Sequence, residues 1–309
     1  HTETPTANGV DFSLYVAVGN SLTAGFADGT LYKSGQVNSY PAILASQFQY
    51  VGGGAFKQPL LNGEWGYPGP KLVLGISKDC NGTPGLGPIM NPASPDTAGD
   101  ATNIATSGPY NNIGVPGIRC VDVLFPGYAF LNPYAQRLFA NPSGRALDEM
   151  KRIPPTFFTL WLGANDVLGY ATGGGEGSTS GLVPGDISPM PQFSVSYDSV
   201  VNTMTAGGAK GVLINIPDIT AIPFFTTIPS KGLLLTTAQA TQLNAAYAAA
   251  GITFNEGANN FIIQDPSVPV IGLRKIKDDE LLLLTIPQDS LKCGGWGSIK
   301  PIPKKYVLD

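Results

Sequence analysis

Short apolar runs alternate along the chain with segments in which apolar residues recur at helical spacing. The β-branched and aromatic runs predict three buried strands, at residues 14–18, 156–162 and 211–216. The helical pattern predicts helices at residues 39–48, 193–204 and 236–250, with Thr236 or Thr237 as the N-cap of the last one. This order of strands and helices is typical of a parallel α/β sheet.

The C-terminal region has a different pattern. Short β-like segments occur at residues 260–264, 270–275 and 280–286. Their close spacing favours hairpins, because a parallel crossover needs a dozen or more residues. We therefore expect a small antiparallel β extension over residues 260–286.

Two glycine- and proline-rich stretches, residues 52–111 and 169–190, interrupt the α/β pattern, in a chain with 39 glycines and 27 prolines. Long irregular segments inside a domain are often functional. These loop insertions could wall a substrate cleft or decorate the surface without a role, and the sequence leaves both interpretations open. We find no internal repeat and treat residues 1–309 as one domain.

Composition narrows the function classes. The 309 residues carry a net charge of −4, only 13% are charged, and there is no basic cluster, which argues against nucleic acid as a partner. No apolar run approaches the roughly 20 residues of a membrane-spanning helix. The three cysteines, Cys80, Cys120 and Cys293, have neither CxxC spacing nor a histidine nearby, which excludes a zinc site of the usual pattern. One disulfide with a free thiol, or three free thiols, both remain open.

The first candidate for chemistry is Ser21, which the predicted strand at residues 14–18 delivers onto a turn flanked by glycine. A serine in such a position can act as a nucleophile when a base takes its proton. The glycine-bearing loop at residues 112–117 precedes a helical-looking segment at residues 119–124. Its Gly117 N–H could stabilise a developing negative charge.

The second candidate is Asn165, in the turn that follows the predicted strand at residues 156–162. Open α/β sheets build their sites at the carboxyl ends of strands. We therefore expect the Asn165 amide to donate a further hydrogen bond to the same negative charge. Its neighbour Asp166 is interpreted as a structural carboxylate.

These blocks, in this order, resemble the SGNH hydrolases, also called GDSL-type esterases and lipases. By this resemblance Ser21 in Gly-Asn-Ser-Leu is the nucleophile, Gly117 is the glycine of the second block, and Asn165 in Gly-Ala-Asn-Asp is the asparagine of the third. Residues 38–45 and 155–162 look like large secreted bacterial members, often lipoproteins. The similarity extends from about residue 11 to residue 309.

The resemblance implies a three-layer α/β/α, flavodoxin-like fold and the hydrolysis of a carboxylic ester through a serine acyl-enzyme. It implies esterase, lipase, acylhydrolase or deacetylase activity on an ester-bearing small molecule, a lipid or an acetylated glycan. It implies no metal and no organic cofactor. The expected location is secreted, periplasmic or anchored in the outer membrane of a bacterium.

The chain departs from the family pattern in two places. Asn20 stands where the family has an aspartate, which changes a local hydrogen bond. The Asp-x-x-His block is absent, and the only histidine is His1. We therefore expect the base to lie beyond Asp309, in a further segment or a separate C-terminal fragment. The alternative is a noncatalytic glycan- or lipid-binding module that retains the fold. The acidic run at residues 278–280 is interpreted as a turn, although it invites a metal-binding hypothesis.

Overall fold

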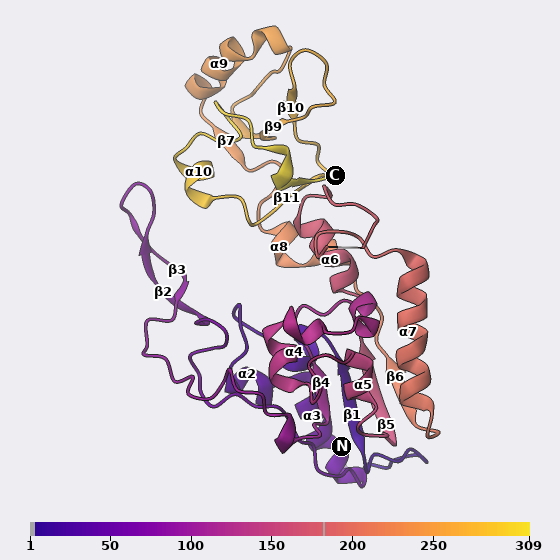
Figure 1. The fold of residues 1–309 in the computed structure, drawn as a ribbon. Coiled ribbons are helices and arrows are strands. Elements are labelled where there is room, and N and C mark those ends of the chain that lie inside the picture. Colours follow the sequence, from indigo (N-terminus) through magenta and orange to yellow (C-terminus); the bar gives the residue numbers. More distant parts are fainter. Residues whose placement is uncertain (1–3, 182) are drawn as a thin grey trace. The chain divides into compact units, whose positions relative to one another are not determined.

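The structure is a computed structural model that describes residues 4–181 and 183–309. Its described residues divide into two compact units (Figure 1). Unit 1 comprises residues 4–75, 86–166 and 188–217, and unit 2 comprises residues 76–85, 167–181, 183–187 and 218–309. The chain crosses repeatedly between the units, so neither is one continuous stretch of sequence.

Unit 1 is built on a four-stranded parallel sheet with the order β4-β1-β5-β6. The strands are β1 (Tyr15–Gly19), β4 (Asn112–Gly114), β5 (Phe157–Trp161) and β6 (Lys210–Leu213). The prediction of a parallel α/β sheet is thus confirmed, and the three strands predicted for this region are β1, β5 and β6. At the carboxyl ends of the strands, Gly19 of β1 lies opposite Gly114 of β4 on one side and Trp161 of β5 on the other.

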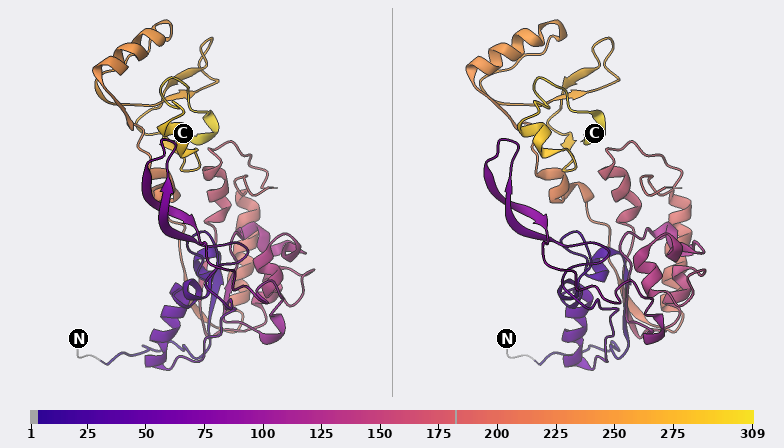
Figure 2. Two further views of the ribbon diagram at one scale, coloured as in Figure 1. Left: turned by 90° about the vertical axis from the view of Figure 1, so that its left-hand side faces the viewer. Right: turned by 60° about the vertical axis from the view of Figure 1, so that its left-hand side comes forward.

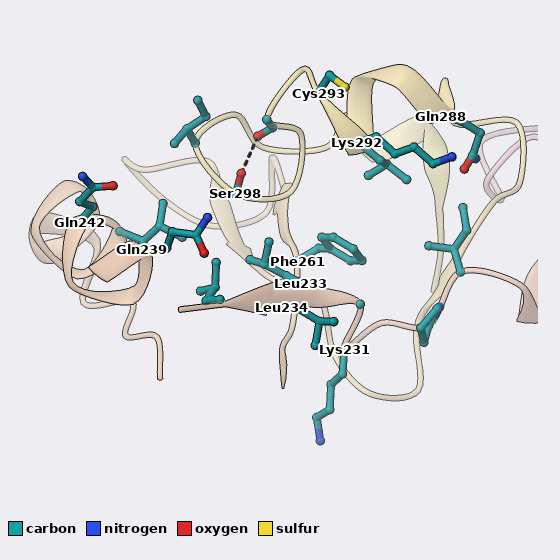
Figure 3. Close-up of a pocket in the computed structure, with 18 of the residues that line it drawn as sticks. Lys231, Leu233, Leu234, Gln239, Gln242, Phe261, Gln288, Lys292, Cys293 and Ser298 are labelled. Atoms are coloured by element: carbon teal, nitrogen blue, oxygen red, sulfur yellow. Dashed lines mark hydrogen bonds between the residues drawn. The ribbon is translucent and has the colours of Figure 1, made fainter. Parts of the chain in front are cut away.

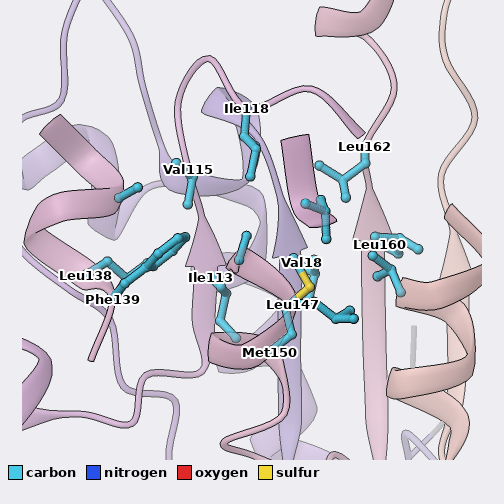
Figure 4. Close-up of a cluster of buried hydrophobic side chains, with 14 of the residues drawn as sticks. Val18, Ile113, Val115, Ile118, Leu138, Phe139, Leu147, Met150, Leu160 and Leu162 are labelled. Atoms are coloured by element: carbon cyan, nitrogen blue, oxygen red, sulfur yellow. The ribbon is translucent and has the colours of Figure 1, made fainter. Parts of the chain in front are cut away.

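Apolar residues cover both faces of this sheet, because alternate strand residues point to opposite sides. On one face Val16, Val18, Phe158 and Leu160 join the main hydrophobic cluster, to which α4, α5 and α7 contribute (Figure 4). On the other face Tyr15 and Ala17 pack with residues of α3. The two views of Figure 2 show α3 on one side of the sheet and α4 and α5 on the other. Unit 1 therefore has three layers.

The helices of unit 1 are short except for α7. They are α1 (Ser21–Ala24), α2 (Lys33–Val37), α3 (Tyr40–Phe48), α4 (Pro133–Leu138), α5 (Ala146–Met150) and α7 (Met190–Thr205), while α6 (Asn165–Thr172) begins in unit 1 and continues into unit 2. The predicted helices at residues 39–48 and 193–204 are confirmed as α3 and α7. The 3₁₀ helices of the described chain are Gln49–Val51, Ala105–Ser107, Cys120–Leu124, Tyr128–Phe130, Ile219–Ala221, Ala248–Ala250 and Lys304–Tyr306.

Unit 2 combines short strands with three more helices. It contains α8 (Pro223–Thr226), β7 (Leu233–Leu235), α9 (Thr237–Ala246), β8 (Gly257–Asn259), β9 (Ile262–Gln264), β10 (Leu273–Lys275), β11 (Leu281–Leu282), α10 (Gln288–Lys292) and β12 (Val307–Leu308). The strands pair antiparallel as β7 with β8, β9 with β10 and β11 with β12. Of these pairs, only β9 with β10 lies wholly within residues 260–286, where the sequence predicted antiparallel β structure. Thr236 caps α9, since its hydroxyl accepts a hydrogen bond from the N–H of Gln239.

The predicted loop at residues 52–111 contains a hairpin of β2 (Leu72–Lys78) and β3 (Pro84–Met90). The tip of this hairpin belongs to unit 2, where Cys80 forms a disulfide with Cys293. Cys120 is a buried free thiol in unit 1. The structure thus selects one of the pairings that the sequence left open. None of the described helices is both long enough and apolar enough to span a membrane.

Candidate active site at the carboxyl edge of the sheet

Ser21 is the first residue of α1, directly beyond the end of the central strand β1. The buried Asn20 caps this helix, and its side-chain oxygen accepts a hydrogen bond from the N–H of Leu22 at 3.2 Å. Within residues 4–181 and 183–309, neither the hydroxyl nor the N–H of Ser21 has a hydrogen-bond partner. Both groups of the predicted nucleophile are therefore available to a substrate.

Gly117 lies in the loop that follows β4. The N–H of Val115 donates to the carbonyl oxygen of Gly19 at 3.0 Å, which ties the start of this loop to the end of β1. Gly117 is exposed and has a φ of +81°, a conformation that favours glycine. Its N–H donates to no other described residue. It is therefore available as a hydrogen-bond donor.

Asn165 is the first residue of α6, and it follows β5 through a turn at Gly163 with a φ of +114°. Its Nδ2 donates to the carbonyl oxygen of Ile118 at 2.9 Å. This contact joins the start of α6 to the residue after Gly117. An asparagine amide carries two N–H donors, so one remains for a ligand.

The sheet brings these three predicted residues to the same edge of unit 1. Ser21, Gly117 and Asn165 follow β1, β4 and β5, which are adjacent, parallel and aligned at their carboxyl ends. Each offers at least one N–H without a partner in the described chain. A cluster of such donors can stabilise an oxyanion, because it replaces the hydrogen bonds that water would make.

Sequence reasoning identified Asp166 only as a structural carboxylate, without its partners. Its side chain is buried and accepts hydrogen bonds from the N–H groups of Cys120 at 2.6 Å and Val121 at 3.3 Å. Burial raises the pKa of Asp166 above its ordinary value, while these hydrogen bonds act in the opposite direction. Asp166 thus fastens the segment after Gly117 to the start of α6. A pattern in one segment could not indicate which backbone groups it contacts.

A chain of hydroxyl groups lies behind the first turn of α1. The hydroxyl of Thr23 is 3.2 Å from that of Tyr40, which is 3.3 Å from the hydroxyl of Thr159, and Tyr15 bonds to the same threonine at 2.8 Å. Burial raises the pKa of Tyr40. These groups stay protonated at neutral pH and hold α1 against the sheet, so we assign them a structural role.

The described residues contain no imidazole, since His1 lies outside them. They also hold no group of three or more His, Cys, Asp and Glu side chains placed to bind a metal ion. The acidic run forms a turn in which Asp278 pairs with Lys231 and Glu280 pairs with Arg274. Those carboxylates are engaged in ion pairs.

The outer edge of β6 is uncovered in unit 1. Only β5 pairs with β6 among the described strands, and Val212 and Leu213 are 48% and 50% exposed. Beside this edge, α7 and residues 213–216 line a groove of about 430 Å³. Phe193 and Tyr197 of α7 line it as stacked rings 5.7 Å apart. An open strand edge beside an apolar groove can accept a further strand.

Comparison of the chain with protein-family models, with curated proteins and with solved structures finds no match.

Proposed function

We propose that the protein is the main part of a serine ester hydrolase in which Ser21 is the nucleophile. The motif resemblance to SGNH hydrolases supports this proposal. In order of sequence the four strands of the sheet have the arrangement 2-1-3-4, and this arrangement agrees with the first four strands of the flavodoxin-like order 2-1-3-4-5. The finer fold assignment is therefore part of the proposal.

The observation that carries the proposal is the set of donors at the carboxyl edge of three adjacent strands. The N–H of Ser21, the N–H of Gly117 and the second N–H of Asn165 have no partner in the described chain. In the proposed reaction, the Ser21 oxygen attacks the ester carbonyl and these donors hold the oxyanion. The alcohol then leaves, and water releases the acyl group from Ser21. Removing a single donor of this kind from a hydrolase costs about 10²–10³-fold in rate.

The base in this proposal comes from a separate segment that carries Asp-x-x-His and takes the Ser21 proton as the hydroxyl attacks. The open edge of β6 and the groove beside α7 are the places we propose for its docking. The proposed substrate is an ester-bearing small molecule, a lipid or an acetylated glycan, as the family resemblance implies. The proposed location is the bacterial periplasm, outer membrane or exterior.

The test combines covalent labelling with base rescue. The purified chain is incubated with p-nitrophenyl butyrate while imidazole is titrated, and the rate of imidazole with denatured protein is subtracted. We expect imidazole to raise turnover, because it replaces the missing base, and we expect Ser21→Ala to remove the increase. Ser46→Ala is the matched control, since Ser46 is exposed and its hydroxyl donates to the carbonyl oxygen of Ile43.

A fluorophosphonate should also modify Ser21 in the presence of imidazole, as read by peptide mass spectrometry. Rescue that persists in Ser21→Ala would contradict the role of this serine. Absence of both rescue and labelling in a folded protein would favour the noncatalytic binding module.

A further inference from the structure

A pocket of about 1130 Å³ lies wholly within unit 2 (Figure 3). Its walls come from β7, from α9, and from α10 with the segment that follows it. Small-molecule sites have volumes of about 300–1000 Å³, so this pocket has room for an elongated ligand. The proposed ester-hydrolase site does not use it.

The middle of the pocket is apolar. Leu233 and Leu234 of β7 lie beside Phe261, and Figure 3 shows these residues between glutamines of α9 on one side and Gln288 with Lys292 on the other. Leu234 is 74% exposed, and Ile299, which also lines the pocket, is 68% exposed. Large apolar side chains grouped around a cavity indicate a surface that a ligand covers.

Charge at the pocket has one sign. Lys231 and Lys292 are its charged lining residues, and no aspartate or glutamate of the described chain lines it. Lys231 extends away from the apolar centre in Figure 3 and pairs with Asp278 at 2.8 Å. The ammonium of Lys292 makes no ion pair or hydrogen bond with any residue in the described ranges. In a chain of net charge −4, this lysine at one end of an apolar pocket favours a ligand with an anionic end.

We propose that the unit 2 pocket binds one long-chain carboxylate, with the alkyl chain along Leu233, Leu234 and Phe261 and the carboxylate at Lys292. The apolar centre and the single cationic end match the two ends of such a molecule. This site stands on unit 2 alone and does not depend on catalysis by Ser21. The Ser21→Ala variant therefore binds the ligand as the parent protein does.

The test is fluorescence titration of the full chain with cis-parinaric acid, followed by displacement with hexadecanoate, hexadecan-1-ol and butyrate. We expect saturable one-to-one binding, displacement by hexadecanoate and no displacement by butyrate at equal concentration. Leu234→Asp should weaken both long-chain ligands about tenfold, because it removes apolar contact area. Leu131→Asp in unit 1 is the matched control, since Leu131 is 73% exposed and lies outside the pocket.

A second pair of variants tests the carboxylate. Lys292→Gln should weaken hexadecanoate about fivefold and leave hexadecan-1-ol unchanged, whereas the control Lys300→Gln should change neither. Equal effects on the acid and the alcohol would overturn the assignment of the anionic end. Absence of saturable binding, or binding that Leu234→Asp leaves intact, would overturn the site. So would a protein dimer that forms without ligand and that Leu234→Asp dissociates.

Discussion

Replacing Asp166 by asparagine tests whether this buried side chain holds the loop that carries Gly117. The carboxylate accepts two backbone hydrogen bonds, from Cys120 at 2.6 Å and Val121 at 3.3 Å. An asparagine of the same shape can accept one of them through its oxygen. Its NH₂ group then faces the other N–H, which loses its acceptor at the buried Cys120 or the half-buried Val121.

An unsatisfied buried donor costs about 1–3 kcal/mol, so Asp166→Asn should lower the free energy of unfolding by about 2 kcal/mol. For a domain of this size class that is a fall of about 4–8 °C in melting temperature. Hydrogen exchange should locate the effect, with faster exchange at the amides of Cys120 and Val121. Any Ser21-dependent esterase turnover should fall about tenfold further than the loss of folded protein explains, because the segment after Gly117 is no longer fixed.

Asp148→Asn is the matched control, since Asp148 also accepts a backbone hydrogen bond three residues back and pairs with Arg145, but its side chain is 44% exposed. The Asp148→Asn substitution should lower the free energy of unfolding by less than about 1 kcal/mol. If Asp166→Asn melts within about 1 °C of the parent protein and the two amides exchange at unchanged rates, the reasoning is refuted.

Three further changes have defined outcomes. Gly114→Ala should lower the thermal stability of unit 1 by about 2 kcal/mol, because its Cβ would lie 2.3 Å from the backbone nitrogen of Ala24; a melting temperature equal to the parent's would contradict this. Glu280→Gln should destabilise unit 2 at pH 7 and matter less near pH 3. Burial acts to raise the pKa of Glu280, but its hydrogen bonds and its pairing with Arg274 hold that pKa below its ordinary value. The stability that this charge contributes is therefore present above the pKa of an unfolded glutamate, about 4.3, and is lost as the pH falls through the lowered pKa of the folded state. Urea titrations of both proteins at the two pH values measure the difference in their free energies of unfolding. A difference that is the same at both pH values would disprove this prediction. Cys293→Ser should lower the free energy of unfolding of unit 2 by about 2–4 kcal/mol, as measured by calorimetry, and the reduced parent protein should melt at the same temperature as the variant. A variant as stable as the oxidised parent would exclude a stabilising cross-link.

The sequence predicted the central sheet because its strands are apolar on both faces. Residues 14–18 are a continuous apolar run and residues 156–162 are apolar except for Thr156 and Thr159, and in the structure both faces of β1 and β5 are covered. The same logic located Ser21 and Asn165, since a residue just past a buried parallel strand must lie at the carboxyl edge of the sheet. Residue type indicated an N-cap at Thr236 or Thr237, and the structure selects Thr236.

Other features depend on contacts between distant segments, which no local pattern contains. The hairpin of β2 and β3 has the sequence of a loop, with four residues among Pro84–Met90 that are Gly or Pro. The unit boundaries pass through continuous elements such as α6, without a linker composition. The unit 2 pocket forms from residues 227–299 of several elements. Spacing also gave no basis for pairing Cys80 with Cys293.

The disulfide has a consequence for the order in which the protein folds. Cys80 and Cys293 are 213 positions apart, so during synthesis Cys80 has no partner until the rest of unit 1 and most of unit 2 have been made. Cys120 appears much earlier and would be the wrong partner. It becomes inaccessible once the core of unit 1 closes around it, because it is fully buried there. Folding of the sheet before oxidation therefore prevents Cys80 of the hairpin from pairing with Cys120. The folding of unit 1 thus favours the correct disulfide, which stabilises unit 2.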